Sequence, residues 1–199
     1  MKILVIGAGG AVGKAIVAEL GARHEIVEAG RNSGAFRVDV LDPASVHRLF
    51  ADVGSLDAVV MAVGRVHFGP LGEMTAEQFR SGLDDKLMGQ VNVVLAGQHR
   101  LNDGGSFTLT SGILSAEPIR DGVNATAVNA AVDGFVRAAA IELPRGLRIN
   151  AVSPTVLAES MATYGPYFRG FEPAPAARVA LAYSRSVEGA QTGRIYTVW

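Results

Sequence analysis

KILVIGAGGAVGKAIVAEL, residues 2–20, is the stretch that decides the fold. Residues 3–6 are apolar at every position, which predicts a strand buried on both faces of a sheet. A glycine-rich turn follows, and a helix over residues 13–20 comes next. This order is typical of a pyrophosphate site, because backbone N–H groups and the helix dipole face the negative charge. A glycine turn without a ligand is the alternative. The expected phosphate-binding residues are Gly7, Gly9, Gly10, Ala11, Val12 and Gly13.

Short β-branched runs alternate with helical patterns along the rest of the chain. We expect strands over residues 25–29, 36–40, 57–61, 106–110, 147–152 and 194–198. We expect helices that open at Asp42-Pro43 and that span residues 83–101, 124–143 and 176–184. Repeated βα units predict one α/β domain over residues 1–199, a doubly wound parallel sheet of Rossmann type with helices on both faces. The Tyr-, Phe-, Gly- and Pro-rich stretch near residues 157–175 is the predicted lid.

Bulk composition excludes several classes of function. The net charge is −1 without a basic stripe, so we expect no nucleic-acid partner. The chain has no cysteine, which excludes disulfides and thiolate metal sites, and we expect no metal. No apolar run approaches the roughly 20 residues that span a bilayer, so we expect no membrane partner and a cytoplasmic location.

The sequence Gly30-Arg31-Asn32-Ser33 falls where the second predicted strand ends, beside the adenosine ribose of a bound dinucleotide. An acidic residue there would favour a free 2′-hydroxyl, whereas Arg31 followed by Ser33 suits a 2′-phosphate. This pattern favours NADP(H) over NAD, although an exposed loop arginine is the alternative. Asp39 and Val40, at the end of the next predicted strand, are expected beside the adenine.

Four further segments carry a family resemblance by their order and spacing: Met61-Ala62-Val63-Gly64, residues 106–111, INAVSP at residues 149–154, and QTGRIY at residues 191–196. Together with the glycine turn they resemble the short-chain dehydrogenase/reductase family along nearly the whole chain. The resemblance implies an oxidoreductase that binds its cofactor partly through Ala62, Val63, Gly64, Lys86, Thr110, Pro154, Thr155 and Val156.

The resemblance breaks at the residues that perform the reaction. The family carries Tyr-x-x-x-Lys on its long alanine-rich helix. Aligning residues 129–135 with that segment places Asn129 at the lysine and Ala125 at the tyrosine. A carbonyl that accepts hydride also needs a proton donor, but alanine has no proton to give and asparagine does not titrate. We therefore expect a divergent family member that lacks this pair.

Four residues are candidates for the missing chemistry. Ser111 matches the family's catalytic serine with one residue of uncertainty in register, and a strand-end cap is the alternative. Lys86-Leu87-Met88-Gly89 resembles the family's Asn-x-x-Gly, so Lys86 would bring an ammonium into the same space; a solvated lysine beside Asp84 and Asp85 is the alternative. His67 titrates in the right range, and Tyr164 brings a phenol from the lid, although a pocket-wall role suits both.

Two functions remain open. The first is an NADP-dependent oxidoreductase that transfers hydride between the nicotinamide and a small carbonyl or alcohol, with a nonstandard proton donor. The second is a catalytically degenerate NADP-binding sensor or regulatory protein. The family's pairing of helices also implies a homodimer or homotetramer through residues 83–101 and 124–143, where an alanine-rich helix allows close approach.

Overall fold

The computed structural model describes residues 1–199, and its centre is a seven-stranded parallel sheet. Strand order is β3-β2-β1-β4-β5-β6-β7, and all neighbouring strands run parallel. This is the doubly wound α/β fold that the sequence predicts. The order reverses between β1 and β4, so a crevice opens at their carboxyl ends. The strands are β1 (Lys2–Ile6), β2 (Glu25–Gly30), β3 (Phe36–Arg37), β4 (Leu56–Met61), β5 (Leu101–Thr110), β6 (Arg148–Pro154) and β7 (Ile195–Val198).

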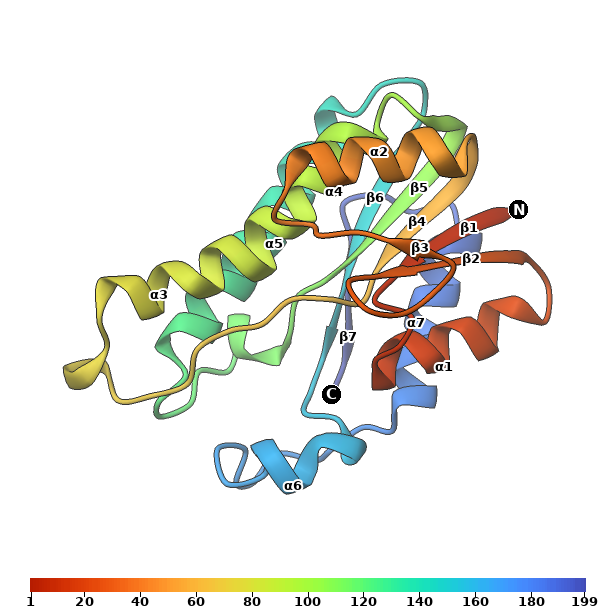
Figure 1. Cartoon of the computed structure of the whole chain (residues 1–199). Helices are drawn as coiled ribbons and strands as arrows, with labels where there is room; N and C mark the ends of the chain where they lie inside the picture. Colours follow the sequence, from red (N-terminus) through yellow and green to blue (C-terminus); the bar gives the residue numbers. More distant parts are fainter.

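Helices cover both faces of the sheet (Figure 1). α1 (Ala11–Gly21) and α7 (Ala176–Glu188) lie on one face, and α2 (Pro43–Val53), α4 (Gly89–Gly97) and α5 (Val123–Glu142) lie on the other. Alternate residues of β1 enter two separate apolar cores: Ile3 and Val5 pack toward α1 and α7, whereas Leu4 and Ile6 pack toward the opposite layer. This two-sided burial explains why β1 is apolar at every position.

The helix expected over residues 83–101 has different limits in the structure. The helical run begins earlier, with α3 (Ala76–Gly82), which a capping box between Thr75 and Gln78 starts. A π-helical segment, η2 (Leu83–Met88), joins α3 to α4. The run ends at Gly97, because Leu101 pairs with Leu56 and already belongs to β5. The expectations that the helix reaches residue 101 and that the strand begins at residue 106 were therefore wrong.

The strand expected over residues 36–40 is also shorter. β3 covers only Phe36–Arg37, because the chain turns at once into α2. The Asp39 amide donates to Ser45 Oγ, and the Asp42 amide donates to the Asp39 carbonyl. α2 begins as predicted, with the Asp42 side chain accepting from the Ala44 amide and Pro43 in the first turn.

The segment between β6 and α7 lies beyond the carboxyl ends of the strands (Figure 1). It contains a 3-10 turn (Ala158–Ser160) and the short helix α6 (Met161–Tyr164). A bridge between Leu157 and Ala174 closes its base. The segment therefore has a defined shape, and its action as a lid stays a prediction.

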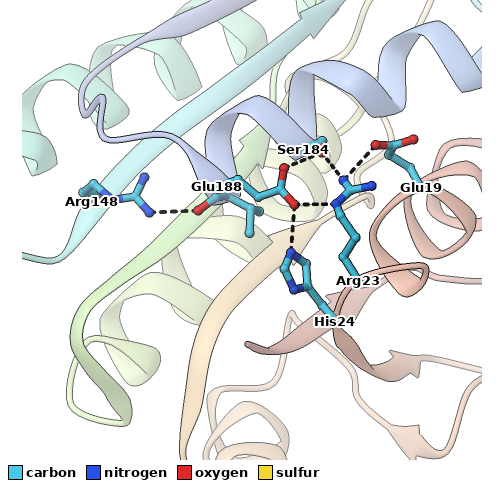
Figure 2. Close-up of polar contacts among 7 residues, drawn as sticks. Glu19, Arg23, His24, Arg148, Ser184 and Glu188 are labelled. Atoms are coloured by element: carbon cyan, nitrogen blue, oxygen red, sulfur yellow. Dashed lines mark hydrogen bonds and ion pairs between the residues drawn. The ribbon is translucent and has the colours of Figure 1, made fainter.

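An ionic cluster joins the end of α1 and the residues just after it to the last turn of α7 (Figure 2). Arg23 Nε lies 2.8 Å from Glu188 Oε1, and His24 Nε2 lies 2.9 Å from the same oxygen. Arg23 also pairs with Glu19 at 2.9 Å. These contacts lower the pKa of Glu188 to about 2, and the hydrogen bond from Arg23 has the largest effect. Since helices run antiparallel to the strands, the cluster stabilises the end of the molecule opposite the crevice.

Candidate functional site

The glycine turn between β1 and α1 is possible only without side chains at its central positions. Gly7 has φ +91°, and a Cβ there would lie 2.5 Å from the Ala62 carbonyl oxygen. A Cβ on Gly13 would overlap the Gly7 carbonyl oxygen, and one on Gly9 would lie 2.5 Å from Ser33 Oγ. The backbone is therefore packed closely between β1, β4 and the loop after β2, and the first amides of α1 remain open to the crevice.

A first cavity, of about 290 Å³, extends from this turn toward β2 and β3. Arg31 lies on its wall, and Arg31 Nη2 is 3.2 Å from Asp39 Oδ1. This contact orients a half-exposed guanidinium at the rim. Ser33 and Asp39 support the wall without lining it. The lining residues include Gly7, Gly10, Gly30, Arg31, Asn32, Val38 and Val40.

A second cavity, of about 320 Å³, continues from the first along the ends of β4, β5 and β6. The two cavities share Ala62, Val63, Gly64 and Arg65 as a common wall. Ten of the residues expected at the site line the second cavity: Val12, Ala62, Val63, Gly64, Lys86, Thr110, Pro154, Thr155, Val156 and Tyr164.

Lys86 enters the second cavity from the π-helical segment. Its side chain is buried, and its Nζ donates a hydrogen bond to the Ser111 carbonyl oxygen over 2.8 Å. Gly64, at φ +125°, makes room for this side chain, since a Cβ at that position would overlap Lys86 Cγ. Burial lowers the pKa of Lys86 to about 8, and Asp133 opposes that change. A buried lysine with a lowered pKa is a group able to exchange a proton near neutral pH.

Ser111 approaches Lys86 through its backbone. Its side chain is 1% exposed, its Oγ has no hydrogen-bond partner, and it is absent from the cavity wall. The next residue, Gly112, does line the cavity and faces Asn129, whose Nδ2 lies 3.0 Å from the position of a Gly112 Cβ. The match of Ser111 to the family's serine is uncertain by one residue. In the structure Gly112 lies on the cavity wall and Ser111 does not.

Ala125 and Asn129 both line the second cavity from one face of α5. Both are buried, and Asn129 Oδ1 has no partner. The two positions that the resemblance aligns with the family's tyrosine and lysine therefore border the cavity, and they hold alanine and asparagine in this chain.

The two remaining candidates, His67 and Tyr164, are placed differently relative to the second cavity. His67 is not on the cavity wall, and its backbone amide donates to Asn124 Oδ1 over 2.8 Å. Tyr164 lies on the wall, with its ring centroid 5.6 Å from that of Phe68.

Sequence patterns missed a group of wall residues, most of them apolar. Arg65 and Phe68 follow Gly64 closely, so the loop after the fourth strand was the available signal. Leu157, Ser160 and Phe168 fall within the predicted lid, and the others were not distinguishable from ordinary core residues by type alone. The missed residues are Arg65, Val66, Phe68, Gly112, Ile113, Leu114, Leu157, Ser160 and Phe168.

Neither a metal centre nor a membrane span stands out. No group of three or more His, Cys, Asp or Glu side chains lies together as metal ligands would. None of the helices combines the length and the hydropathy needed to cross a bilayer.

The parallel sheet, the glycine turn and the paired cavities define a Rossmann-type nucleotide-binding protein. Residues 8–194 match the family model described as enoyl-(acyl carrier protein) reductase. Versicolorin reductase 1 of Aspergillus parasiticus is 31% identical over 186 residues, which cover 79% of this chain and 70% of that protein. The chain belongs to the short-chain dehydrogenase/reductase family.

Solved structures extend the likeness to the whole chain. The protein lin1944 from Listeria innocua has 49% identity and a TM-score of 0.98, with both chains covered fully. A small-chain dehydrogenase in complex with NADPH has 25% identity and a TM-score of 0.89, covering 100% of this chain and 96% of that one.

The family uses nicotinamide cofactors, and the residues of this chain fit one. The glycine turn has no room for a Cβ at Gly7 or Gly13, and the backbone of Gly7 and Gly10 therefore borders the first cavity directly. The two cavities both border residues 62–65 and so lie next to each other, as a dinucleotide that spans the crevice requires. Thr155 Oγ1 is buried there without a hydrogen-bond partner.

Proposed function

We propose that this chain is an NADP(H)-dependent oxidoreductase that acts on a small carbonyl or alcohol, with Lys86 as its proton donor. One observation carries the proposal: a buried lysine with a pKa of about 8 lies on the wall of the second cavity. When bound, the cofactor supplies or accepts the hydride. The protein must then supply or accept a proton at the substrate oxygen.

Several residues would hold the cofactor. Gly7, Gly10 and the first turn of α1 would face the pyrophosphate, and Val40 would border the adenine. Arg31 would contact a 2′-phosphate from the rim of the first cavity, which supports NADP(H) over NAD. Pro154, Thr155 and Val156 would border the nicotinamide in the second cavity.

Lys86 and Asn129 stand in exchanged positions relative to the family pattern. By the resemblance, the family has asparagine at position 86 and lysine at position 129. In this chain the ammonium therefore comes from the helical run before β5, and the amide comes from α5. Ala125 takes the place of the family's tyrosine on the same cavity wall as Lys86, so a substrate oxygen there would meet the lysine and not a phenol.

The pKa of about 8 suits Lys86 to this task. At pH 7 most of the population is ammonium, yet the proton leaves more readily than from a solvated lysine. In the reducing direction the carbonyl carbon receives hydride and its oxygen receives the Lys86 proton. The resulting neutral amine is tolerated because the side chain is buried, and it regains a proton from solvent through the second cavity.

Apolar side chains on the outer wall of the second cavity favour a small or flat apolar substrate. Ile113, Leu114, Val156 and Phe168 line this part, and Phe68 and Tyr164 add aromatic rings near the opening. Ser111, His67 and Tyr164 remain alternative donors, although only Tyr164 among them lies on the cavity wall.

A sensor or regulatory protein that binds NADP(H) without turnover is the second candidate. The observation in its favour is that Ala125 and Asn129 carry no proton to donate. Its distinguishing property is tight binding without chemistry.

The deciding experiment measures NADPH affinity and NADPH oxidation against ketones, aldehydes and quinones. We expect turnover at saturating NADPH that falls by about 100-fold or more in Lys86→Met, a loss larger than any change in NADPH affinity. Lys2→Met is the matched control, because Lys2 Nζ bonds the Val53 carbonyl at the opposite end of the sheet. Tight NADPH binding with no turnover of any compound would establish the sensor instead.

A further inference from the structure

Lys86 has more hydrogen-bond donors than the structure uses. An ammonium carries three N–H groups. Only one of them has a partner, the Ser111 carbonyl oxygen. The rest of the side chain is buried, so its remaining hydrogens face only the surrounding protein and the contents of the second cavity. Acceptors for them must come from the surrounding protein or from a ligand.

Buried acceptors without partners occur on α5, the helix that packs against the π-helical segment of this lysine. Asn129 and Asp133 are four residues apart, so they lie one above the other on the helix. They are 4% and 6% exposed, and Asn129 Oδ1 and Asp133 Oδ1 both lack a hydrogen-bond partner. A buried carboxylate oxygen with no partner is costly, and a nearby positive charge is the simplest compensation.

We propose that Asp133 is a positioning residue whose carboxylate keeps Lys86 in its charged form at the wall of the second cavity. Asn129 borders the cavity, and Asp133 lies one helical turn further from it, so Asp133 acts on Lys86 without touching the substrate. This inference rests on the proposed role of Lys86 as the proton donor.

Other charged groups near Lys86 are placed differently. Asp84 and Asp85 belong to its own helical segment, and Asp84 is exposed. The Asp85 carboxylate accepts the Arg65 amide over 2.8 Å, and the Arg65 side chain is exposed at the cavity mouth. The ends of β5 and β6 contribute the neutral residues Thr110 and Thr155. Only Asp133 raises the pKa of Lys86 against the effect of burial.

Burial and the Asp133 carboxylate change the pKa of Lys86 in opposite directions. Burial brings the pKa of Lys86 down to about 8, and Asp133 limits the decrease. Removing the carboxylate lowers the pKa further, so more of the lysine is neutral amine at pH 7 and has no proton to transfer to a carbonyl. Reduction would then lose rate at a lower pH than in the parent protein.

Lysine NMR tests this directly, since the chain has only three lysines, Lys2, Lys14 and Lys86. We would titrate the 13Cε resonances of the full-length protein, with and without NADPH. In Asp133→Asn we expect the Lys86 midpoint to fall by about one pH unit. The pH at which carbonyl reduction declines should move by the same amount, with the KM for NADPH unchanged. Asp84→Asn is the matched control and should leave the midpoint in place.

A second variant covers the case in which Asp133→Asn fails to fold. Asp133→Ser also removes the carboxylate and should lower the Lys86 midpoint in the same direction, whereas Asp133→Glu keeps a carboxylate and should leave the midpoint near the parent value. An unchanged Lys86 midpoint in a folded neutral variant overturns the inference. Absence of turnover with a shifted Lys86 midpoint would overturn the proposed function and leave the coupling standing.

Discussion

Backbone forms much of the wall of the first cavity, whereas side chains from several separate elements form the second. Gly7, Gly10, Gly30 and Gly64 border the first cavity. The second takes Lys86 from η2, Asn129 from α5, and Phe168 from the segment before α7. A backbone cradle tolerates little change, because its shape depends on missing Cβ atoms. A wall of side chains allows one functional group to be replaced by another from a different helix. Conserving the cofactor site while changing the reaction site is therefore structurally simple in this fold.

The largest effect that tests this contrast comes from the glycine cradle. In Gly13→Ala the new Cβ would overlap the Gly7 carbonyl oxygen, so the turn must open. Loss of the amide contacts to a charged phosphate should weaken NADPH binding by about 100-fold. Calorimetric titration measures this loss. Gly134→Ala is the control, since nothing lies within 4 Å of its added Cβ and it should leave the affinity unchanged. Equal affinities in Gly13→Ala and the parent would contradict the idea of a backbone cradle.

A smaller effect is expected at Arg31, the cationic side chain of the first cavity that lies nearest to β2. Arg31→Ala should weaken NADPH binding by about tenfold, through loss of one charge-assisted contact, and should leave NADH binding unchanged. Arg48→Ala is a matched control, because Arg48 forms a similar exposed pair with Asp42 outside both cavities. Competition between the two dinucleotides measures the preference. An equal loss for NADH and NADPH would assign Arg31 to general cofactor binding instead.

The same contrast explains what the sequence predicted and what it missed. Residues 2–20 identify the fold because a strand buried on both faces, a glycine turn and a helix follow each other locally. Lys86 was identified only by spacing, and its burial depends on Gly64, a residue 22 positions earlier. Asp133 gave no signal, because a carboxylate on a long helix is ordinarily solvated. The helix end at Gly97 was missed since the pairing of Leu101 with Leu56 is a contact between distant residues.

An intermediate effect, on stability alone, is expected at the end of the molecule opposite both cavities. Glu188→Gln removes the carboxylate that joins Arg23 and His24, and it should lower the free energy of unfolding at pH 7 by about 1 kcal/mol. The melting temperature should fall by about 2–4 °C, with NADPH affinity unchanged. The pKa of Glu188 is lowered from 4.5 to about 2, so its contribution is complete above pH 4.5 and disappears as the pH falls toward 2.

Thermal melts over this pH range measure the contribution. The difference between Glu188→Gln and the parent should vanish at the acidic end. Glu142→Gln, at the exposed end of α5, is the control and should melt like the parent at every pH. A loss of NADPH affinity in Glu188→Gln would mean that the shape of the glycine turn depends on contacts at the far end of α1. The first cavity would then be less independent of side chains than its backbone wall indicates.

The smallest effect is expected at Tyr164, and it separates a wall residue from a proton donor. Tyr164→Phe removes the hydroxyl and keeps the ring beside Phe68, so the rate of carbonyl reduction should change by less than about twofold. Tyr164→Ala removes the ring as well and should raise the KM for the carbonyl while leaving kcat nearly unchanged. Steady-state rates at saturating NADPH distinguish these outcomes. A hundredfold loss of kcat in Tyr164→Phe would transfer the proton-donating role from Lys86 to this phenol. The second cavity would then keep a tyrosine as its acid, but one that reaches the substrate from the segment before α7 instead of from α5.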